Sequence, residues 1–473
     1  MSDPKNTQAL DEHDELYADY WHVNTGDKTI HAKRMGGRWR NIKWLTSAVW
    51  LAFFLGPYLR WDGRQAVLFD IPDRQFHIFG LAIFPQDFWM LSLVLLFFAI
   101  LLAVVTTLAG RVYCGFFCFQ TVWTDVYTWI EDRLEGPPAK RVKLDQAPLD
   151  FTKFRIKFVK HLAWLAIAAL TGVHFAAWFV DVFQLWKGYF TLTAPNVAWI
   201  VLGLFTAGTY FLAGFMREQA CFWLCPYARI QGVMLDPETV LPAYDFGRGE
   251  PRGRVKKGQD RGESGLGDCV DCGQCVAVCP TGIDIRHGQQ EGCITCALCI
   301  DACDVVMDKI GRPRGLIRYA SLDELEGGDT QPLLKRPRVL VYLVILSAAV
   351  VGIAYGIANI SSIDLKVLHE RQPLFVPLKD GSIQNKYVLK VMNKTSKDLS
   401  LALTAVGPEG LTLVGGDEGF AATHGKVNEL TVFVRVPRAK LREEMTPLTF
   451  KVEAENAPDV TSSYQSVFVG PAR

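Results

Sequence analysis

Two short stretches decide the fold: Cys269-Val-Asp-Cys272-Gly-Gln-Cys275-Val-Ala-Val-Cys279-Pro280 and Cys293-Ile-Thr-Cys296-Ala-Leu-Cys299-Ile-Asp-Ala-Cys303. Each follows the spacing of bacterial ferredoxins, in which three close cysteines bind one [4Fe–4S] cluster and the fourth reaches the other cluster. The doubled pattern predicts two clusters rather than paired zinc sites. We assign cluster 1 to Cys269, Cys272, Cys275 and Cys303, and cluster 2 to Cys293, Cys296, Cys299 and Cys279. Asp304 stands where the motif usually has proline, and this departure leaves every thiol in place.

The other four cysteines form two pairs, which together we call the four-thiol set: Cys114 and Cys118, and Cys221 and Cys225. On a continuous helix, the i to i+4 spacing of each pair puts both thiols on one face. Thiols suit Cu(I), an iron–sulfur cluster or zinc, and a pair can also cycle as a disulfide. Buried cysteines can also pack simply as small apolar side chains. All twelve cysteines lie in short clusters, which indicates metal ligation in a reducing compartment rather than a secreted disulfide framework.

Five apolar stretches predict a bundle of membrane helices, because about 20 residues at about 1.5 Å each cross about 30 Å of hydrocarbon. They are Trp44–Leu59, Asp87–Ala109, Phe158–Val180, Asn196–Met216 and Val339–Ala358. Half of the 473 residues are hydrophobic although 21% are charged, so the apolar residues are concentrated in blocks. The first forty residues are polar and charged, and we expect no cleavable signal peptide.

The distribution of basic residues predicts the topology. Lys and Arg are dense before the first stretch, between the second and third, and between the fourth and fifth, but sparse in Arg60–Gln86 and near Lys187. Because basic loops remain in the cytoplasm, we expect the cysteines on the cytoplasmic side of the membrane and the C-terminal part on the far side. The family resemblance described below implies a bacterial cytoplasmic (inner) membrane, which makes the far side the periplasm. The expected partners are the lipid bilayer and an unidentified cytoplasmic electron donor, and a homo-oligomer is compatible with the sequence. A net charge of +1 gives no field that attracts nucleic acid.

The last part of the chain has the pattern of β-structure. Apolar and polar residues alternate in Leu399–Ala405, Leu430–Val436 and Leu448–Ala454, with turns such as Gly407–Gly410 between such runs. This period is typical of strands with one buried face, and it predicts a β-sandwich of about 100 residues. By contrast, Asp236–Gly267 is rich in Gly, Pro and charge and predicts an extended linker.

These observations predict a multi-domain membrane protein. Its parts are a cytoplasmic N-terminal segment (1–43), a transmembrane α-helical bundle with spans 1–4 (44–216) and a cytoplasmic loop (110–157), a linker with a two-[4Fe–4S] ferredoxin-type domain (217–337), span 5 (338–359) and a periplasmic β domain (360–473).

Two histidines in the third apolar stretch, His161 and His174, raise the question of haem. Thirteen residues apart on one helix, they are about 20 Å apart along its axis, too far to hold one iron. The other stretches contain no histidine, so we interpret this pair as packing residues or part of a proton path. No Cys-x-x-Cys-His and no Rossmann glycine pattern occur, so neither a c-type haem nor a dinucleotide site is indicated.

The sequence resembles the FixG/CcoG family of cytochrome oxidase accessory proteins over nearly its whole length. Besides the cysteine block, the resemblance rests on Pro57-Tyr-Leu-Arg-Trp-Asp-Gly-Arg-Gln-Ala-Val-Leu-Phe-Asp-Ile-Pro72, His77-Ile-Phe-Gly80, Pro85-Gln-Asp-Phe88, Gln120-Thr-Val-Trp-Thr124, Tyr244-Asp245 and Arg248-Gly-Glu-Pro-Arg-Gly253. It implies an immunoglobulin-like fold for residues 360–473 and places the family's Cys-x-x-x-Cys-Pro pairs on the four-thiol set. Phe119 departs from this pattern, because the first pair usually has proline there.

The resemblance implies an oxidoreductase that reduces Cu(II) to Cu(I) during assembly of a cbb3-type cytochrome c oxidase. Copper would be the substrate or a transient ligand of the four-thiol set, and the implied partners are a copper-transporting ATPase and oxidase assembly proteins. The alternative is a NapH-like membrane electron-transfer subunit that passes quinol electrons to a periplasmic reductase. The C-terminal β domain and the Pro57–Pro72 string favour the first interpretation.

Overall fold

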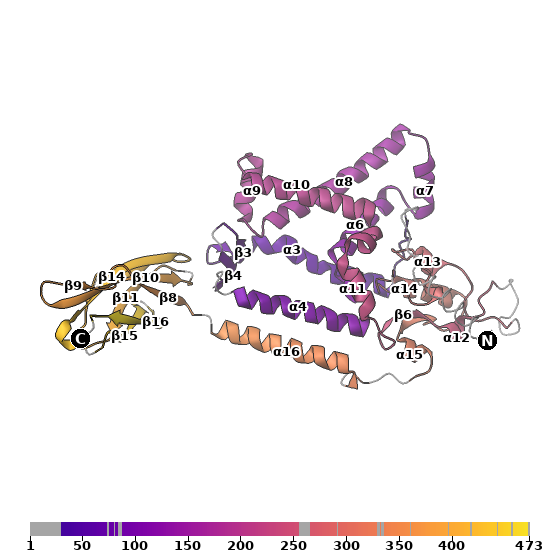
Figure 1. Cartoon of the computed structure of the whole chain (residues 1–473). Helices are drawn as coiled ribbons and strands as arrows, with labels where there is room; N and C mark the ends of the chain where they lie inside the picture. The colour runs from indigo at the N-terminus through magenta and orange to yellow at the C-terminus, as the bar shows by residue number, and fades with distance from the viewer. Residues whose placement is uncertain are drawn as a thin grey trace, which may run out of the picture. The chain divides into compact units, whose positions relative to one another are not determined.

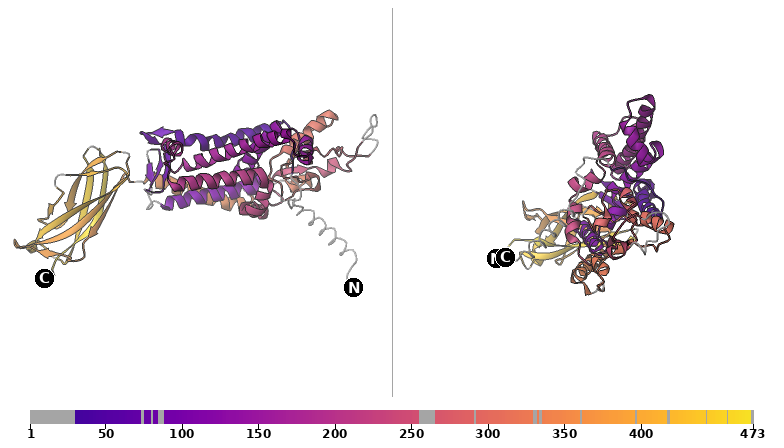
Figure 2. Two further views of the ribbon diagram at one scale, coloured as in Figure 1. Left: turned by 90° about the horizontal axis from the view of Figure 1, so that it is seen from above. Right: turned by 90° about the vertical axis from the view of Figure 1, so that its right-hand side faces the viewer.

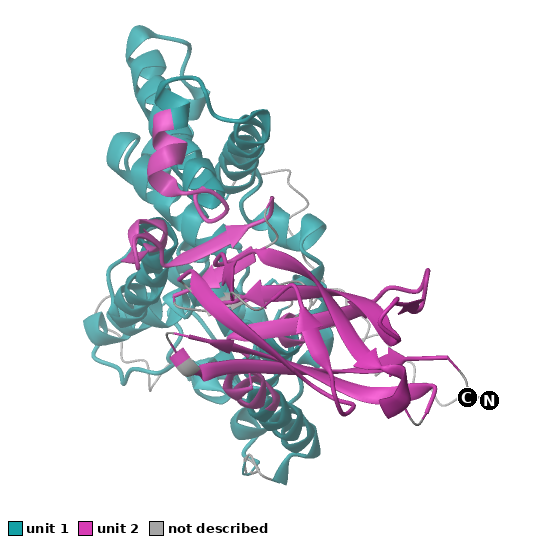
Figure 3. Ribbon diagram, turned by 90° about the vertical axis from the view of Figure 1, so that its left-hand side faces the viewer, with its two compact units in different colours: residues 1–55, 93–176, 188–351 teal, residues 56–92, 177–187, 352–473 magenta. Residues whose placement is uncertain are grey.

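A computed structural model describes residues 30–471 apart from short gaps. The gaps are residues 73–74, 80, 84–87, 255–264, 291, 329–331, 333–334, 360, 396, 417–418, 442 and 456. Residues 1–29 of the predicted N-terminal segment and part of the predicted linker therefore lie outside the described residues, drawn in grey in Figure 1. The chain divides into two compact units, coloured separately in Figure 3. Unit 1 comprises the described residues up to 55 with 93–176 and 188–351, and unit 2 comprises 56–92, 177–187 and 352–473.

Among the described residues, four helices are long and apolar enough to cross a membrane. They are α4 (Phe88–Ala109), α8 (Phe151–Ala176), α10 (Asn196–Phe211) with its π-helical extension η4 (Leu212–Met216), and α16 (Pro337–Ala358). They confirm four of the five predicted stretches. Helix α8 begins earlier than predicted because its first turns carry Lys153, Arg155 and Lys157, which interrupt the apolar pattern without interrupting the helix. Large apolar side chains such as Leu95 and Val344 remain exposed, as expected of helices that face lipid.

The stretch predicted as span 1, Trp44–Leu59, is helical but is not one long apolar helix. It comprises α2 (Arg38–Ser47), η1 (Ala48–Trp50), α3 (Leu51–Leu55) and η2 (Gly56–Tyr58). The helical stretch starts before the predicted span because the charged side chains of Arg40 and Lys43 are buried in α2 rather than left in a loop. It ends at Gly56-Pro57-Tyr58, where proline cannot donate a backbone hydrogen bond.

Short elements connect the long helices. Before α4 the structure has β1 (Arg60–Trp61), β2 (Arg64–Gln65), β3 (Val67–Asp70), β4 (Gln75–Ile78) and β5 (Leu81–Ile83). Strands β1 and β2 form a hairpin, and β3, β4 and β5 form a small antiparallel sheet. Between the other long helices lie α5 (Val112–Phe116), α6 (Phe119–Leu134), α7 (Pro138–Gln146) and α9 (Val182–Phe190). Within unit 1, α8 packs along α10 (Figure 1).

The cysteine-rich region is built mainly from short helices and strands. Its elements are η5 (Ala220–Leu224), α11 (Pro226–Met234), β6 (Leu241–Tyr244), α12 (Phe246–Gly249), α13 (Gln274–Ala277), η6 (Ile285–His287), α14 (Leu298–Lys309), β7 (Ile317–Ala320) and α15 (Leu322–Leu325). Strand β6 is buried and pairs antiparallel with β7. The extended linker predicted for Asp236–Gly267 is therefore wrong at β6, because the apolar run Leu-Pro-Ala-Tyr finds a partner strand far along the chain.

Residues 363–469 form the predicted β-sandwich (Figure 2). Its elements are β8 (Ile363–His369), β9 (Val376–Pro377), β10 (Ser382–Asn393), β11 (Leu399–Val406), β12 (Thr412–Val414), β13 (Phe420–Ala422), β14 (Val427–Pro437), η8 (Arg438–Lys440), β15 (Met445–Ala454) and β16 (Ala457–Val469). One sheet has the order β12-β14-β10-β8, with β9 beside β10, and the other has the order β13-β11-β15-β16. Alternate side chains of both sheets, including Leu401, Val434 and Phe450, share one buried core.

Candidate metal centres

The first predicted set of ligands lines one cavity. Its lining contains Cys269, Cys272, Cys275 and Cys303, with apolar walls that include Tyr244, Met307 and Ile317. Cys275 lies on α13 and Cys303 on α14, so the cysteine far along the sequence joins the three of the first motif. We call this cavity the cluster 1 site.

The second predicted set lines a neighbouring cavity, the cluster 2 site. Its lining contains Cys279, Cys293, Cys296 and Cys299, and Cys275 also borders it. Both cavities present four thiols and are walled mainly by apolar side chains, which are the donor set and the enclosure that a [4Fe–4S] cluster needs. When bound, such clusters take up and release single electrons.

The two motifs share one backbone conformation. Asp271 and Thr295, at equivalent positions, have φ of 51° and 56°, and Gly273 and Ala297 have φ of 61° and 59°. A left-handed residue other than glycine costs roughly 1–3 kcal/mol and persists where the surroundings enforce it. The repeated left-handed residues turn the chain tightly between successive cysteines, so that both motifs direct their thiols into their cavities.

Burial raises the pKa of several of these thiols and so keeps them neutral when no metal is bound. It raises the pKa of Cys275 to about 11 and that of Cys293 and Cys303 to about 12. Iron binds the thiolate, so cluster insertion must release these protons.

The four thiols outside the ferredoxin motifs are neighbours in unit 1. Charges on Cys118, Cys221 and Cys225 would each raise the pKa of Cys114, which burial already raises. Burial, with the thiolates of Cys118 and Cys225, also raises the pKa of Cys221 to about 12. The structure therefore brings together the two pairs that the sequence separates by about a hundred residues.

Neither pair lies on one continuous helix, so the condition under which its two thiols would share a helix face is not met. Cys114 lies on α5 and Cys221 on η5, whereas Cys118 and Cys225 are the extended N-cap residues of α6 and α11. Pro226 explains the second break, because a residue before proline avoids the helical conformation. Within the described part of the chain, no three His, Cys, Asp or Glu side chains are spaced to hold a single metal ion. The four thiols thus lie near one another, and binding of one ion by three or more of them would require their side chains to turn toward one another.

One member of the four-thiol set, Cys114, packs directly against the cluster 2 site. Cys114 shares a buried cluster with Val278 and Cys296, and the backbone N–H of Arg111 donates to Thr295 Oγ1 at 3.1 Å. A Cβ on Gly115 would lie 2.5 Å from the backbone oxygen of Ile294 and 3.0 Å from Cys296 Cα. The absence of a side chain at Gly115 therefore permits the close approach of α5 to the second motif.

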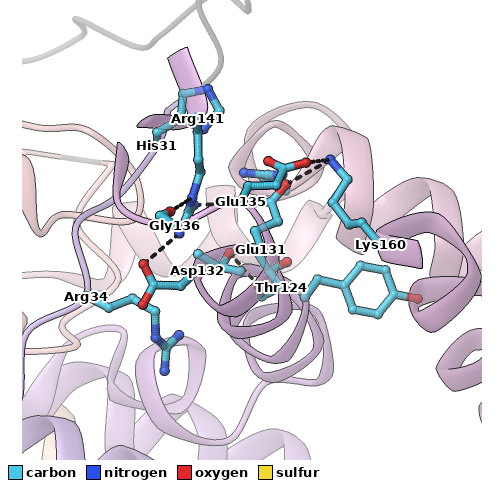
Figure 4. Close-up of polar contacts among 12 residues, drawn as sticks. His31, Arg34, Thr124, Glu131, Asp132, Glu135, Gly136, Arg141 and Lys160 are labelled. Carbon is cyan, nitrogen blue, oxygen red and sulfur yellow. Dashed lines mark hydrogen bonds and ion pairs between the residues drawn. The ribbon is translucent and has the colours of Figure 1, made fainter. Parts of the chain in front are cut away.

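Buried ion pairs tie α6 to its neighbours beside these centres. Figure 4 shows Arg141 from α7 and Lys160 from α8 directed toward carboxylates at the end of α6. Arg141 Nη1 lies 3.3 Å from Glu131 Oε2, and Lys160 Nζ lies 2.9 Å from Glu135 Oε1. Arg217 Nη2, just before η5, lies 2.7 Å from Glu131 Oε1. These pairs fix the segment that carries Cys118 relative to the segment that carries Cys221.

The histidines of α8 make local contacts. His161 Nδ1 lies 3.0 Å from the hydroxyl of Tyr210, and His174 Nδ1 lies 2.7 Å from the backbone oxygen of Leu170. His161 also packs beside Trp164, and His174 packs beside Phe54. These contacts give both side chains a packing role.

Sequence reasoning missed Asp125 on α6, whose carboxylate contacts Arg34, Arg40 and Lys43. Although burial opposes its ionisation, Lys43, Arg40 and Arg34 hold the pKa of Asp125 well below its usual range. One available signal was Asp125 itself, the one charged residue between Phe119 and Ile130 of the helix.

Comparisons with known proteins agree with this architecture. A family model described as "4Fe-4S dicluster domain" matches residues 216–322, one described as "4Fe-4S binding domain" matches 91–137, and one described as "IG-like fold at C-terminal of FixG" matches 353–471. The chain is 40% identical over 461 residues to nitrogen fixation protein FixG of Rhizobium meliloti, covering 88% of each. It is 44% identical over 395 residues to protein RdxA of Cereibacter sphaeroides, covering 81% of this chain and 83% of that one. Protein RdxB of the same organism is 41% identical over 401 residues, covering 82% of this chain and 84% of that one. With its ferredoxin-type motifs, apolar helices and C-terminal sandwich, the chain belongs to the FixG family of iron–sulfur electron-transfer proteins.

Proposed function

We propose that the protein is a cupric reductase, which converts Cu(II) to Cu(I) for the assembly of a cbb3-type cytochrome c oxidase. The observation that carries the proposal is the packing of Cys114, in the four-thiol set, against Cys296 of the cluster 2 site. A metal ion bound by the four-thiol set would lie beside residues that hold an electron-transfer cluster. Thiolates are soft ligands that favour Cu(I), so binding at these residues assists the reduction of the bound ion.

The proposal includes an orientation in the membrane, with the metal centres in the cytoplasm and the β-sandwich in the periplasm. The loops with few basic residues, 56–92 and 177–187, belong to unit 2 together with the C-terminal residues. The loops rich in Lys and Arg belong to unit 1. This grouping supports the orientation, because basic loops remain in the cytoplasm. Reduced copper would then be available to a copper-transporting ATPase on the cytoplasmic side.

The test is reduction of Cu(II) by the full-length protein, purified anaerobically in detergent and reduced with dithionite that is then removed. Cu(I) formation is followed with a chelator that absorbs only as its Cu(I) complex. Replacing Cys114, Cys118, Cys221 and Cys225 together with Ser should slow Cu(I) formation at least tenfold, since serine is not a soft ligand. Iron and acid-labile sulfide should remain at the wild-type level in this variant. A wild-type rate with intact iron would place copper reduction elsewhere on the chain.

One finding favours a second candidate, in which the four-thiol set holds a third [4Fe–4S] cluster. The model for a 4Fe–4S binding domain matches residues 91–137, where Cys114 and Cys118 are the only cysteines. A cluster there would need two further ligands, and the neighbouring Cys221 and Cys225 would supply them. The chain would then be an electron-transfer subunit rather than a copper reductase, and its iron content would be about twelve atoms instead of about eight.

A further inference from the structure

A cavity beside the four-thiol set is lined by more cations than carboxylates. Its lining contains four cations, Arg34, Arg40, Lys43 and Arg217, two carboxylates, Asp125 and Glu218, and the thiol of Cys221. With all six groups ionised, four positive and two negative charges leave an excess of two positive charges. All these residues belong to unit 1.

Three of the cations share one carboxylate. Arg34 Nη1 and Arg40 Nη1 each lie 2.9 Å from Asp125 Oδ1, and Lys43 Nζ lies 3.1 Å from Asp125 Oδ2. The side chains of Arg40 and Lys43 are 9% and 2% exposed. Charges removed from water need a partner of opposite sign to offset the lost hydration. Asp125 is the one carboxylate that pairs directly with the side chains of these three cations.

Arg40 also has an unused donor. Its Nε is buried and has no hydrogen-bond partner among the described residues, although buried donors are almost always paired. The nearby carboxylate of Asp301 accepts from the backbone N–H of Trp39 and of Arg40, at 3.1 Å and 2.9 Å. Among the other lining cations, Arg217 is paired with Glu131 outside the lining. The region around Arg40 therefore combines open space, an unpaired guanidinium donor and three cations whose side chains share one carboxylate.

We infer that this cavity binds a small oxyanion, a carboxylate or a phosphate, with Arg40 and Arg34 as its principal donors. The planar guanidinium group matches the oxygens of carboxylate and phosphate, and charge-assisted hydrogen bonds of this kind are strong. Because Cys221 lines the same cavity, an oxyanion that chelates a metal would hold that metal beside the four-thiol set. The inference itself does not depend on the copper assignment.

The test is calorimetric titration of the full-length protein in neutral detergent with inorganic phosphate and with citrate, at an ionic strength held constant with sodium chloride. Saturable binding is expected for wild type. Arg40→Gln should raise the dissociation constant at least tenfold, because it removes the unpaired donor and one charge. Arg34→Gln should also raise the dissociation constant. Because Arg34 is slightly more exposed than Arg40, this variant replaces Arg40→Gln in the test if that variant does not fold. The matched control is Arg314→Gln, because Arg314 is 67% exposed and pairs with Asp308 outside the cavity.

A second arm separates the two sources of phosphate. The same titration in nanodiscs compares phosphatidylglycerol with phosphatidylcholine. If phosphate binding is lost in the phosphatidylglycerol nanodiscs but not in the phosphatidylcholine nanodiscs, the natural ligand is an anionic lipid headgroup. Equal binding in both lipids identifies a soluble oxyanion. Absence of saturable binding in detergent, or equal affinity of wild type and both arginine variants, would overturn the proposal and would leave the copper proposal untouched.

Discussion

At the scale of single residues, Phe119 and Asp304 stand where related motifs have proline. The structure shows what each of these two side chains contributes in place of proline. Asp304 lies inside α14, where proline would remove a backbone donor, and its Oδ1 accepts from the N–H of Gly315 at 3.0 Å. Phe119 is the first residue of α6 and stacks on Trp123, with ring centroids 4.2 Å apart. Proline is favourable at the first position of a helix, so only the aromatic contact distinguishes Phe119 from the usual residue.

We therefore expect Phe119→Pro and Phe119→Ala to have the same effect. Both lose the stacking on Trp123 and the edge contact with Trp50, which should cost about 1–3 kcal/mol in the free energy of unfolding. The backbone around Cys118 should not change, because Cys225 has the same N-cap position before Pro226. Thermal unfolding of the two variants measures the comparison. A much larger loss for the proline variant would show that the two pairs differ in backbone geometry.

The ligand sets of the two cluster sites could be predicted from sequence because spacing alone fixes them. The left-handed conformation of Thr295 and Ala297 could not be predicted from sequence, because neither residue type favours it. The conformation is required by the arrangement of the thiols around the cavity. The charges around Asp125 were also missed. Arg34, Arg40 and Asp125 come from segments that meet only in the folded chain.

At the scale of elements, the contact between α5 and the second ferredoxin motif depends on Gly115. Gly115→Ala should push α5 away from the motif, because the new methyl group would lie 2.5 Å from the oxygen of Ile294. We expect slower Cu(I) formation with wild-type contents of thiols and iron. The matched control is Gly203→Ala on α10, where a Cβ would meet nothing within 4 Å. Equal rates for the two variants would show that this packing is unimportant for copper reduction.

The attachment of α6 to α2, through Asp125, and to α8, through Glu135, should depend on pH. Because cations hold the pKa of Asp125 and Glu135 below the ordinary values, both carboxylates stabilise the fold above pH about 4. Their contribution is lost as pH falls through the lowered values, since the unfolded chain binds protons first. Asp125→Asn should cost about 3–5 kcal/mol at pH 7, because three buried cations lose their carboxylate.

Unfolding temperatures of wild type and Asp125→Asn at pH 7 and below pH 4 measure this dependence. The difference between the two proteins should shrink as the pH falls below about 4, because the unfolded wild-type chain then binds a proton at Asp125 while the folded protein keeps the carboxylate charged, which lowers the stability of wild type alone. A constant difference would show that the charge of Asp125 does not stabilise the fold.

At the scale of the whole molecule, the long helices and the sandwich follow from hydrophobic length and period, and both were predicted. Span 1 was predicted as one helix, whereas the structure divides these residues among α2, η1, α3 and η2, and the helical stretch begins earlier, at Arg38, with Arg40 and Lys43 buried. Strand β6 was missed because its partner β7 lies more than seventy residues away, beyond the range of any local pattern.

Reporter fusions test the proposed orientation. Fusions after Lys143 and after Gly267 should behave as cytoplasmic, and fusions after Ile363 as periplasmic, because Lys143 and Gly267 lie in loops rich in basic residues. A cytoplasmic signal from the fusion after Ile363 would mean that an even number of segments crosses the membrane.

The most direct test of the central claim is a count of the metals bound to the full-length protein after anaerobic purification and addition of one equivalent of Cu(I). The same count is made on the variant in which Ser replaces all four cysteines of the four-thiol set. Two clusters and one copper site predict about eight iron and eight sulfide per chain in both proteins, with copper retained only by wild type. About twelve iron in wild type and about eight in the variant, with no copper bound by either, would contradict the account and assign the four-thiol set to a third cluster.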